Sequence, residues 1–448
     1  MKALWLCSWY PNRYVYHNGA FVQRQAVAVA RFVDVATLHA VEKTTEILSA
    51  DGSKHLNTEG SVFELKTQNL ALENDDSELI NDYGFDIEIN RKTHFEVIVY
   101  FPKSTNPFSK LIHQFSAYNK GFKLIENQWG TPDLVHLHVI VSAGIYALFL
   151  HFFHRIPFLI TEHSSMYRAE TGVFKRSNWI FKTLVRACVK KAKAVIALSP
   201  FYASTMQQHG LINRFFYVPN VVDTDLFKPK NDLNLIENSA LIDSDLIKSK
   251  ALKVINLIHV SGLHDPIKNV SGILNAVKKL SEKRQDFILD IIGDPFEQPP
   301  YLALVKRLKI EKFVRFHNYL FIEIVAKMMQ NAHIFVLFSR FEGLPCVILE
   351  AMSAGLPVVA TETGGISDWV TEASGRLIQL EDEAALTASL DFIMSHLSHF
   401  NAEKIREKIV ETCSYQAVGQ AIFDIYKQSF VQNVVEVSNL DDVRQKIK

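Results

Sequence analysis

The stretch SRFEGLPCVILEAMSAGLPVVATETGG, residues 339–365, carries the clearest sequence signal for the fold. It continues the strand-like run HIFVLFSRF, and Pro345 then suits the start of a helix because its φ is restricted and it lacks an N–H. The pattern predicts that this helix runs to about Ser353 and ends near Gly355, before the strand-like run PVVAT. A strand, a helix and another strand in this order are typical of an α/β domain.

The front of this predicted helix is a candidate anion site. Backbone N–H groups around Gly343, Leu344 and Cys346 would lie in its first turn, where they favour a phosphate. Glu342 precedes the helix and Glu350 lies one to two turns inside it, so the two carboxylates could hold different parts of one ligand. From the residues alone a plainer interpretation stays open, in which Glu342 meets the helix dipole and Glu350 is solvated.

The alternation of strand-like and helical patterns extends along the whole chain. Strand-like runs in the first half are ALWLCS, DVATLHA, FEVIVYF, DLVHLH, PFLITEH, AVIALS and FFYVPN. The second half begins again with VINLIHVSG, FILDIIGD, FVRFHNYL and HIFVLFSRF, followed by PVVAT and RLIQL. Helical patterns such as 20–32 and 179–191 lie between them. We therefore predict an α/β fold of two Rossmann-like, doubly wound domains facing a central cleft, with ligand at the carboxyl ends of the strands.

The length of 448 residues also favours two domains. We place the N-terminal domain at 1–222 and the C-terminal domain at 223–430, with 228–250 as a linker or insertion and 431–448 as a charged tail. The polar, acidic segment 57–92 is expected to form a hairpin or surface excursion.

The composition is that of a globular protein of enzyme size. Lys+Arg and Asp+Glu number 48 each, which argues against a polyanionic partner such as nucleic acid. Four scattered cysteines without CxxC spacing favour free thiols in a reducing compartment. The apolar run 139–150 is too short to span a membrane, and we interpret the first residues as a buried strand rather than a signal peptide. The expected location is cytoplasmic.

The segment FEGLPCVILEAMSAGLPVVATETGG closely resembles the glutamate–seven–glutamate segment of the retaining family-4 glycosyltransferases (glycosyl transferases group 1), which have the GT-B fold. Further matches occur in the family's order and cover most of the chain. NGAFVQRQA resembles the glycine loop after the first strand, and DLVHLH resembles the segment that ends in the family histidine. VPNVVDTDLFKP resembles the inter-domain stretch, VSGLHDPIKNVSGILNA the Gly-Arg-Leu…Lys element, and IIGD the glycine-ended strand.

This resemblance implies the catalytic residues His138, Lys268 and Glu342. His138 would lie under the reacting sugar, Lys268 would neutralise the diphosphate leaving group, and Glu342 would meet hydroxyls of the transferred sugar. Glu350 would accept hydrogen bonds from the ribose hydroxyls. The donor-binding residues implied in this way are Gly19, Gly262, His264, Lys268, Gly293, Glu342, Gly343, Leu344, Pro345, Glu350, Gly364 and Gly365.

The chain departs from the family pattern after Gly262, where Leu263 stands in place of an arginine. A second cationic contact to the diphosphate would then have to come from His264 or from another cation such as Arg340.

Alternative metal motifs are weak. DTD at Asp223 belongs to the inter-domain match and DSD at Asp243 to the linker, so no metal site is expected. We interpret His136 as a packed strand histidine because carboxylate or cysteine ligands are missing around it. No cofactor is expected beyond the nucleotide sugar itself, a UDP-sugar in preference to a GDP-sugar.

Residues 171–222 contain no Asp or Glu. They contain basic residues interleaved with Phe174, Trp179, Ile180 and Phe181, the basic ones being Lys175, Arg176, Lys182, Arg186, Lys190, Lys191 and Lys193. A basic helix with aromatic residues can lie on an anionic membrane, and it can equally be a solvated outer face.

The sequence thus predicts a retaining glycosyltransferase of the hexosyltransferase type. It would move a sugar from a nucleotide-diphosphate sugar to a hydroxyl of a glycan or lipid-linked acceptor, in cell-envelope or exopolysaccharide synthesis. Peripheral contact with the inner face of the membrane would involve 174–193. The alternative is an inactive nucleotide-sugar-binding or scaffold protein of the same fold, which the missing arginine supports and the presence of Glu342, Glu350, Lys268 and His138 opposes.

Overall fold

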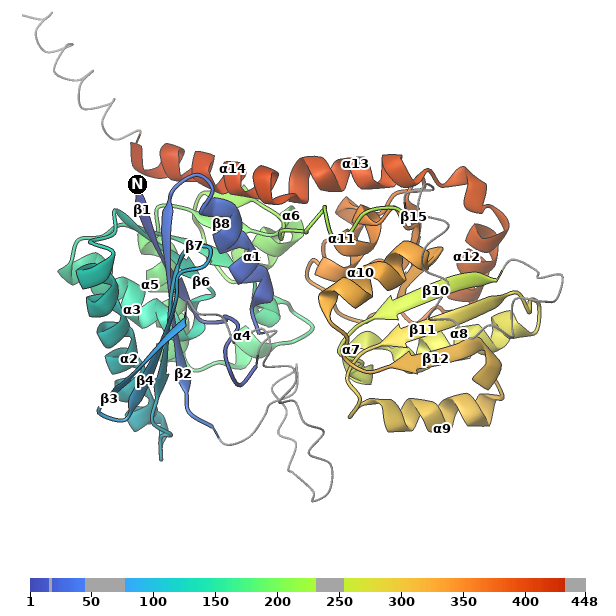
Figure 1. Cartoon of the computed structure of the whole chain (residues 1–448), viewed down its shortest axis with the longest axis horizontal. Coiled ribbons are helices and arrows are strands. Elements are labelled where there is room, and N and C mark those ends of the chain that lie inside the picture. The colour runs from blue at the N-terminus through green and yellow to red at the C-terminus, as the bar shows by residue number, and fades with distance from the viewer. Residues whose placement is uncertain (16–17, 45–76, 231–253, 432–448) are drawn as a thin grey trace, which may run out of the picture. The chain divides into compact units, whose positions relative to one another are not determined.

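A computed structural model describes residues 1–15, 18–44, 77–230 and 254–431. The chain forms two compact units (Figure 1). The first contains Met1–Asn220 and the C-terminal segment from Tyr415 on, and the second contains Val221–Ser414.

The first unit is built on a nine-stranded sheet with the order β3-β4-β5-β2-β1-β6-β7-β8-β9. Its strands are β1 (Lys2–Cys7), β2 (Asp34–Glu42), β3 (Ser77–Asp82), β4 (Phe85–Asn90), β5 (Phe95–Phe101), β6 (Leu134–His138), β7 (Phe158–Glu162), β8 (Val195–Ala197) and β9 (Phe215–Tyr217). All pairs are parallel except β3 with β4 and β4 with β5. The antiparallel β3–β4 hairpin confirms the prediction for the end of segment 57–92, whose residues 57–76 lie outside the described residues.

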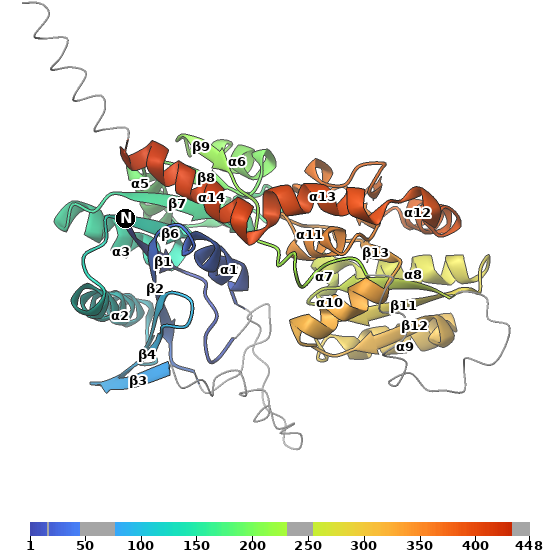
Figure 2. The ribbon, with the colours of Figure 1, turned by 45° about the horizontal axis from the view of Figure 1, so that its top comes forward.

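Helices cover both faces of this sheet (Figures 1 and 2). They are α1 (Ala20–Val29), α2 (Pro107–Gln128), α3 (Ile140–Phe153), α4 (Val173–Arg176), α5 (Trp179–Lys191), α6 (Pro200–Gln207) and α14 (Tyr415–Tyr426). Helices α2, α3 and α5 share one apolar core with the strands, while α1 packs against α14. Strands buried on both faces are typical of parallel sheets, which explains the continuous apolar runs in the sequence.

The second unit has an all-parallel sheet with the order β12-β11-β10-β13-β14-β15. Its strands are β10 (Ile255–Val260), β11 (Phe287–Ile292), β12 (Val314–His317), β13 (Ile334–Leu337), β14 (Val358–Thr361) and β15 (Gly375–Ile378). Its helices are α7 (Asp265–Lys268), α8 (Val270–Ser281), α9 (Gln298–Leu308), α10 (Ile322–Asn331), α11 (Cys346–Ser353), α12 (Glu383–Ser395) and α13 (Ala402–Cys413). Helices α8, α9 and α12 form one core with the sheet, and α11 packs against α13 (Figure 2).

Both units are therefore Rossmann-like, and every predicted strand is present. The division of the chain differs from the predicted one at the C-terminus, because α14 belongs to the first unit rather than the second. The reason is close packing on α1: a Cβ added to Gly419 would lie 2.3 Å from the carbonyl oxygen of Ala28. The predicted linker beyond residue 230, including Asp243, and the tail beyond 431 lie outside the described residues. Within the described residues, no helix is long and apolar enough to cross a membrane.

Candidate functional site

The predicted helix within 339–365 is α11, an eight-residue helix that ends at Ser353. Pro345 is its N-cap rather than its first residue, because ψ of 121° keeps Pro345 extended and the helix begins at Cys346. Gly355 has a φ of +77° and lies just beyond the C-cap, the left-handed position that glycine favours. Within the described residues, the N–H groups of Gly343 and Leu344 donate no hydrogen bond. Both precede α11, at the positive end of its dipole.

Two glycines hold the loop that carries Glu342. The N–H of Gly365 donates to the carbonyl oxygen of Gly343 at 2.8 Å. Gly364 has a φ of +65°, and a Cβ at this position would lie 2.1 Å from the carbonyl oxygen of Glu342. Gly364 is thus required for close backbone packing beneath the loop.

Lys268 and Glu342, predicted from distant parts of the sequence, form an ion pair in the structure. The ammonium Nζ of Lys268 lies 2.7 Å from Oε1 of Glu342, and the Glu342 side chain is only 8% exposed. Glu350 is 6% exposed. The interpretation of Glu350 as a solvated helix residue is therefore wrong, since this carboxylate lies inside the unit.

The other predicted residues of this unit lie around the end of β10. Gly262 has open space where a Cβ would be, so a ligand can approach its backbone closely. Gly293 has a structural reason to be glycine, because a Cβ there would lie 2.2 Å from the carbonyl oxygen of Ser261. Leu263, at the position of the family arginine, is completely buried with a φ of +62°. Its side chain belongs to the core of the unit.

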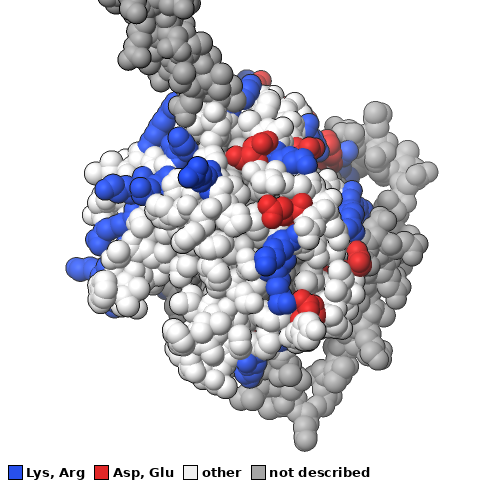
Figure 3. All heavy atoms as spheres, turned by 90° about the vertical axis from the view of Figure 1, so that its left-hand side faces the viewer, with Lys and Arg blue, Asp and Glu red and all other residues white. Residues whose placement is uncertain are grey.

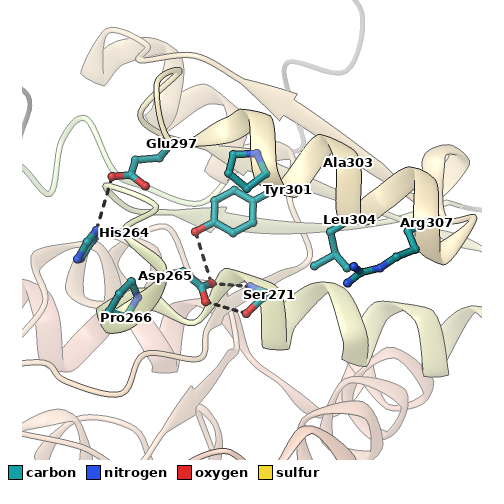
Figure 4. Close-up of a pocket in the computed structure, with 10 residues that line it drawn as sticks. His264, Asp265, Pro266, Ser271, Glu297, Tyr301, Ala303, Leu304 and Arg307 are labelled. Atoms are coloured by element: carbon teal, nitrogen blue, oxygen red, sulfur yellow. Dashed lines mark hydrogen bonds and ion pairs between the residues drawn. The ribbon is translucent and has the colours of Figure 1, made fainter. Parts of the chain in front are cut away.

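His264 lies at the edge of a cavity of about 530 Å³ between α7, α8 and α9 (Figure 4). Its Nδ1 lies 3.5 Å from Oε1 of Glu297, and its side chain is 42% exposed. On the floor of the cavity the carboxylate of Asp265 accepts hydrogen bonds from the N–H and hydroxyl of Ser271, both at 2.8 Å (Figure 4). His264 is thus open to solvent and adjacent to the turn of Lys268.

The guanidinium of Arg340 is hydrogen-bonded to other residues of the same unit. Its guanidinium donates to the carbonyl oxygen of Asp265 at 2.6 Å and to Oδ1 of Asn269 at 2.9 Å, and it pairs with Glu381. All three of its side-chain nitrogens have acceptors in this arrangement. Of the two cations considered in place of the family arginine, His264 is therefore the better placed for a ligand.

In the first unit, the predicted His138 is the last residue of β6 and is completely buried. Its ring stacks on Trp5 with centroids 4.0 Å apart and lies beside His163 at 5.7 Å. Burial, together with the neighbouring His136 and His163, lowers its pKa well below the usual value, so the imidazole is neutral. Within the described residues neither ring nitrogen has a hydrogen-bond partner.

The residues after His138 form a strained turn. Val139 has a φ of +61°, which is costly for a β-branched residue. Its N–H donates to the carbonyl oxygen of Thr161 at 3.1 Å, and its own carbonyl accepts from the hydroxyl of Ser8 at 2.5 Å. Strain of this kind persists where the surroundings hold it and is common at functional sites.

Glu162 and His163 are two residues of this region that the sequence reasoning missed. Oε1 of Glu162 accepts from the N–H groups of His163 and Ser164, at 3.0 and 2.9 Å, and Oε2 accepts from the hydroxyl of Tyr167. Burial raises the pKa of Glu162 to about 7 and lowers that of His163 to about 3. The available signal was the pair of polar residues directly after the apolar run FLIT, at the carboxyl end of a strand.

His136 and Gly19 have structural explanations. His136 is a packed strand histidine, as predicted, with Nδ1 2.7 Å from the hydroxyl of Tyr426. Gly19 caps α1 with a φ of +68°, and a Cβ there would lie 2.5 Å from the carbonyl carbon of Trp9. Within the described residues, no group of three or more His, Cys, Asp or Glu could hold a metal ion.

Two family models match the chain. The model of glycosyl transferases group 1 matches residues 255–396, and that of glycosyltransferase family 4 matches residues 79–226. Among curated proteins, an MMP alpha-(1->4)-mannosyltransferase of Mycolicibacterium hassiacum is 24% identical over 69% of this chain and 74% of its own length. An N-acetyl-alpha-D-glucosaminyl L-malate synthase of Bacillus anthracis is 26% identical over 70% and 80%, respectively.

Solved structures share the fold. Sucrose-phosphate synthase of Thermosynechococcus elongatus superposes with a TM-score of 0.69 at 17% identity, covering 96% of this chain and 100% of that protein. Alr3699/HepE of Anabaena, solved in complex with UDP, superposes with a TM-score of 0.64 at 17% identity and the same coverage. These matches confirm the predicted two-unit GT-B architecture.

Proposed function

The chain belongs to the family 4 (group 1) glycosyltransferases, and we propose that it transfers a sugar with retention from a nucleotide-diphosphate sugar to a hydroxyl of a glycan or lipid-linked acceptor. The observation that carries the donor class is the pair of Lys268 and Glu342 beside the start of α11, with Glu350 buried in the same helix. Lysine and helix N–H groups suit a diphosphate, and buried carboxylates suit sugar hydroxyls.

In the proposed donor complex, each group has one part of the ligand to bind. Lys268 neutralises the diphosphate, whose charge grows as the glycosidic bond breaks, and the N–H groups of Gly343 and Leu344 donate to it. Glu350 accepts hydrogen bonds from the ribose, and Glu342 from the transferred sugar. His264 is the proposed second cation, replacing the family arginine.

Retention follows from a front-face substitution in this proposal. The bond between the anomeric carbon and the diphosphate oxygen breaks, and the acceptor oxygen bonds to the same face of that carbon. The departing diphosphate takes the proton of the acceptor hydroxyl. Burial lowers the pKa of His138 well below the usual value, so its neutral imidazole is a poor proton acceptor and is not assigned this proton. No metal is required, because Lys268 and backbone N–H groups supply the positive potential.

The proposed donor is a UDP-sugar in preference to a GDP-sugar. Alr3699/HepE, which shares the fold, was solved with UDP and with UDP-glucose. The test is calorimetric titration with UDP and GDP, followed by a screen of sugars on the base that binds. Transfer from the matching donor is expected. Tight binding without transfer to any acceptor would favour the inactive nucleotide-sugar-binding protein instead.

We also propose that the enzyme acts in cell-envelope or exopolysaccharide synthesis, in the cytoplasm and at the inner face of the membrane. The support is a surface on the first unit formed by α4, α5 and the end of α3, which we call the basic–aromatic surface. Its exposed apolar residues are Val173, Trp179, Ile180, Phe152 and Phe153, with Trp179 75% and Phe153 76% exposed. Lys191 lies over the ring of Phe152 at 5.5 Å, which joins the two helices.

This surface has the composition of a membrane-contacting face. Figure 3 shows the first unit from one side, with Lys and Arg gathered at the left of the view and no Asp or Glu among them. Helix α5 buries Val185, Cys188 and Val189 and turns Trp179, Ile180 and its basic residues outward. Exposed aromatic and aliphatic side chains among lysines suit the interface of an anionic bilayer.

Liposome co-sedimentation tests this surface. Binding is expected to rise with the fraction of phosphatidylglycerol and to fall with salt. The double change Trp179→Ser and Ile180→Ser should abolish binding at high lipid, whereas Phe321→Ser, an exposed aromatic change in the second unit, should not. If neither the wild type nor the Phe321→Ser control binds anionic liposomes, the membrane contact is refuted and the surface is a solvated face.

A further inference from the structure

The turn that carries Lys268 is too short to hold its own position. Helix α7 has four residues and Lys268 is the last of them. The N–H groups of Ile267 and Lys268 donate to the carbonyl oxygen of His264, and the N–H of Asn269 donates to that of Asp265. Asn269 then adopts a left-handed conformation with a φ of +49°. A single turn of helix is marginal in isolation, so the place of the Lys268 ammonium depends on contacts from outside the turn.

Arg340 supplies such contacts along the whole turn. Its own N–H donates to the carbonyl oxygen of Ile267 at 2.7 Å. Its guanidinium donates to the carbonyl oxygen of Asp265 at one end of α7 and to the side chain of Asn269 at the other, at 2.6 and 2.9 Å. Glu381 pairs with the same guanidinium and fixes its orientation.

Arg340 also belongs to the segment that carries Glu342. It lies between the end of β13 and Glu342, two residues before the carboxylate that meets Lys268. One side chain therefore connects the two loops whose charged groups are 2.7 Å apart. The planar fork of the guanidinium can reach a carbonyl, an amide and a carboxylate at once, which a lysine ammonium cannot reproduce in the same geometry.

We propose that Arg340 is a positioning residue that sets the Lys268 ammonium for the diphosphate of the donor. The inference rests on the proposed function, because it assigns Arg340 through its effect on Lys268. Arg340 itself makes no contact with the ligand in this proposal. Loss of the Arg340 side chain therefore weakens binding of the second phosphate of the nucleotide and leaves binding of the nucleoside part unchanged.

The test compares nucleoside diphosphate with monophosphate by calorimetry. UDP and UMP are the probes, replaced by GDP and GMP if the wild type selects guanine. Arg340→Ala and Arg340→Lys are each expected to weaken diphosphate binding about tenfold, the effect of losing a charged hydrogen bond, and monophosphate binding less than twofold. In the Lys268→Ala background, Arg340→Ala is expected to cost less than a further twofold, because the group it positions is gone.

Arg284 provides the matched control. It is also held by carboxylates, with Nε and Nη2 2.9 and 2.8 Å from Asp286, but it precedes β11 at the opposite end of the sheet. Arg284→Ala should therefore leave the affinity for both nucleotides unchanged. Equal losses for diphosphate and monophosphate in Arg340→Ala, or the same loss in Arg284→Ala, would overturn the inference in favour of general destabilisation.

The remaining outcomes separate the inference from the proposed function. Diphosphate binding that Lys268→Ala leaves intact would overturn the role of Lys268 in the donor site, as would a wild type that binds neither UDP nor GDP. A loss in Lys268→Ala without one in the Arg340 variants would leave the proposed function standing and refute the positioning role. A full additional loss in the double variant would also refute it.

Discussion

Glu342→Gln should separate binding of the leaving group from transfer of the sugar. In the structure the Glu342 carboxylate lies 2.7 Å from the ammonium of Lys268, whose side chain is 24% exposed. A phosphate oxygen that binds the same ammonium at about 2.8 Å comes within about 5 Å of the carboxylate. Lys268 and Glu342 are thus charge-paired, and the product diphosphate has to share Lys268 with the Glu342 carboxylate.

The magnitude follows from Coulomb's law. Two unit charges about 5 Å apart repel each other by about 3 kcal/mol at an effective dielectric constant of about 20. Because Lys268 is partly exposed and salt screens the pair, we discount this to about 1 kcal/mol, or about fivefold in affinity. Glu342→Gln keeps the shape and removes the charge, so UDP or GDP should bind about fivefold more tightly. Transfer should fall, because the amide is a weaker acceptor for the sugar hydroxyls.

Calorimetry with the diphosphate and a turnover assay with the matching donor measure the two effects. Glu282→Gln is the control, since it removes the same charge from a surface pair with Lys278 at 3.2 Å. A folded Glu342→Gln protein that binds the diphosphate as the wild type does, or more weakly, would refute the reasoning. Full transfer activity in this variant would refute the assignment of Glu342 to the sugar.

Three further predictions concern single residues. Glu350→Ala should weaken nucleotide binding about tenfold or more by calorimetry, because a charged acceptor for the ribose is lost, and unchanged affinity would contradict its role. Gly364→Ala should lower the free energy of unfolding by more than about 1 kcal/mol in urea and reduce transfer, since its Cβ displaces Glu342; a neutral effect would contradict the packing argument. Burial raises the pKa of Glu162 to about 7, so stability from its protonated form is present below about 4.5 and lost as the pH rises through about 7. Glu162→Gln should remove up to about 3 kcal/mol of the loss in unfolding free energy between pH 5 and pH 8, and an identical pH profile would refute the raised pKa.

The architecture was readable from the sequence because both sheets are largely parallel and buried. A strand such as β8 or β13 is buried at every position, so its sequence is an unbroken apolar run. Local signals also mark helix ends. The side chain of Asn178 accepts a hydrogen bond from the N–H of Phe181 and so caps the start of α5, and the predicted range 179–191 matches this helix. These features depend on neighbours in the sequence or on burial alone.

The place of α14 could not be predicted in the same way. It belongs to the first unit through contacts with residues about as distant as the chain allows. The Tyr426 hydroxyl contacts His136, which is 290 positions away, and accepts from the indole N–H of Trp5. An amphipathic helix pattern reports that one face is buried but not which partner buries it. The predicted boundary near 430 followed sequence order, whereas in the structure α14 belongs to the first unit.

The charged residues of the candidate site show the same limit: the sequence indicates which residues are charged, but not which groups they contact. The family resemblance implied that Lys268 and Glu342 make separate contacts to a diphosphate and a sugar, and it left Arg340 as an alternative second cation. The structure pairs the first two at 2.7 Å and surrounds the third with acceptors. An arginine with filled donors stabilises a neighbouring turn, and a lysine with one carboxylate partner still has donors for a ligand. It follows that the number of acceptors around each cation, rather than its place in a motif, decides which of them can bind the phosphate.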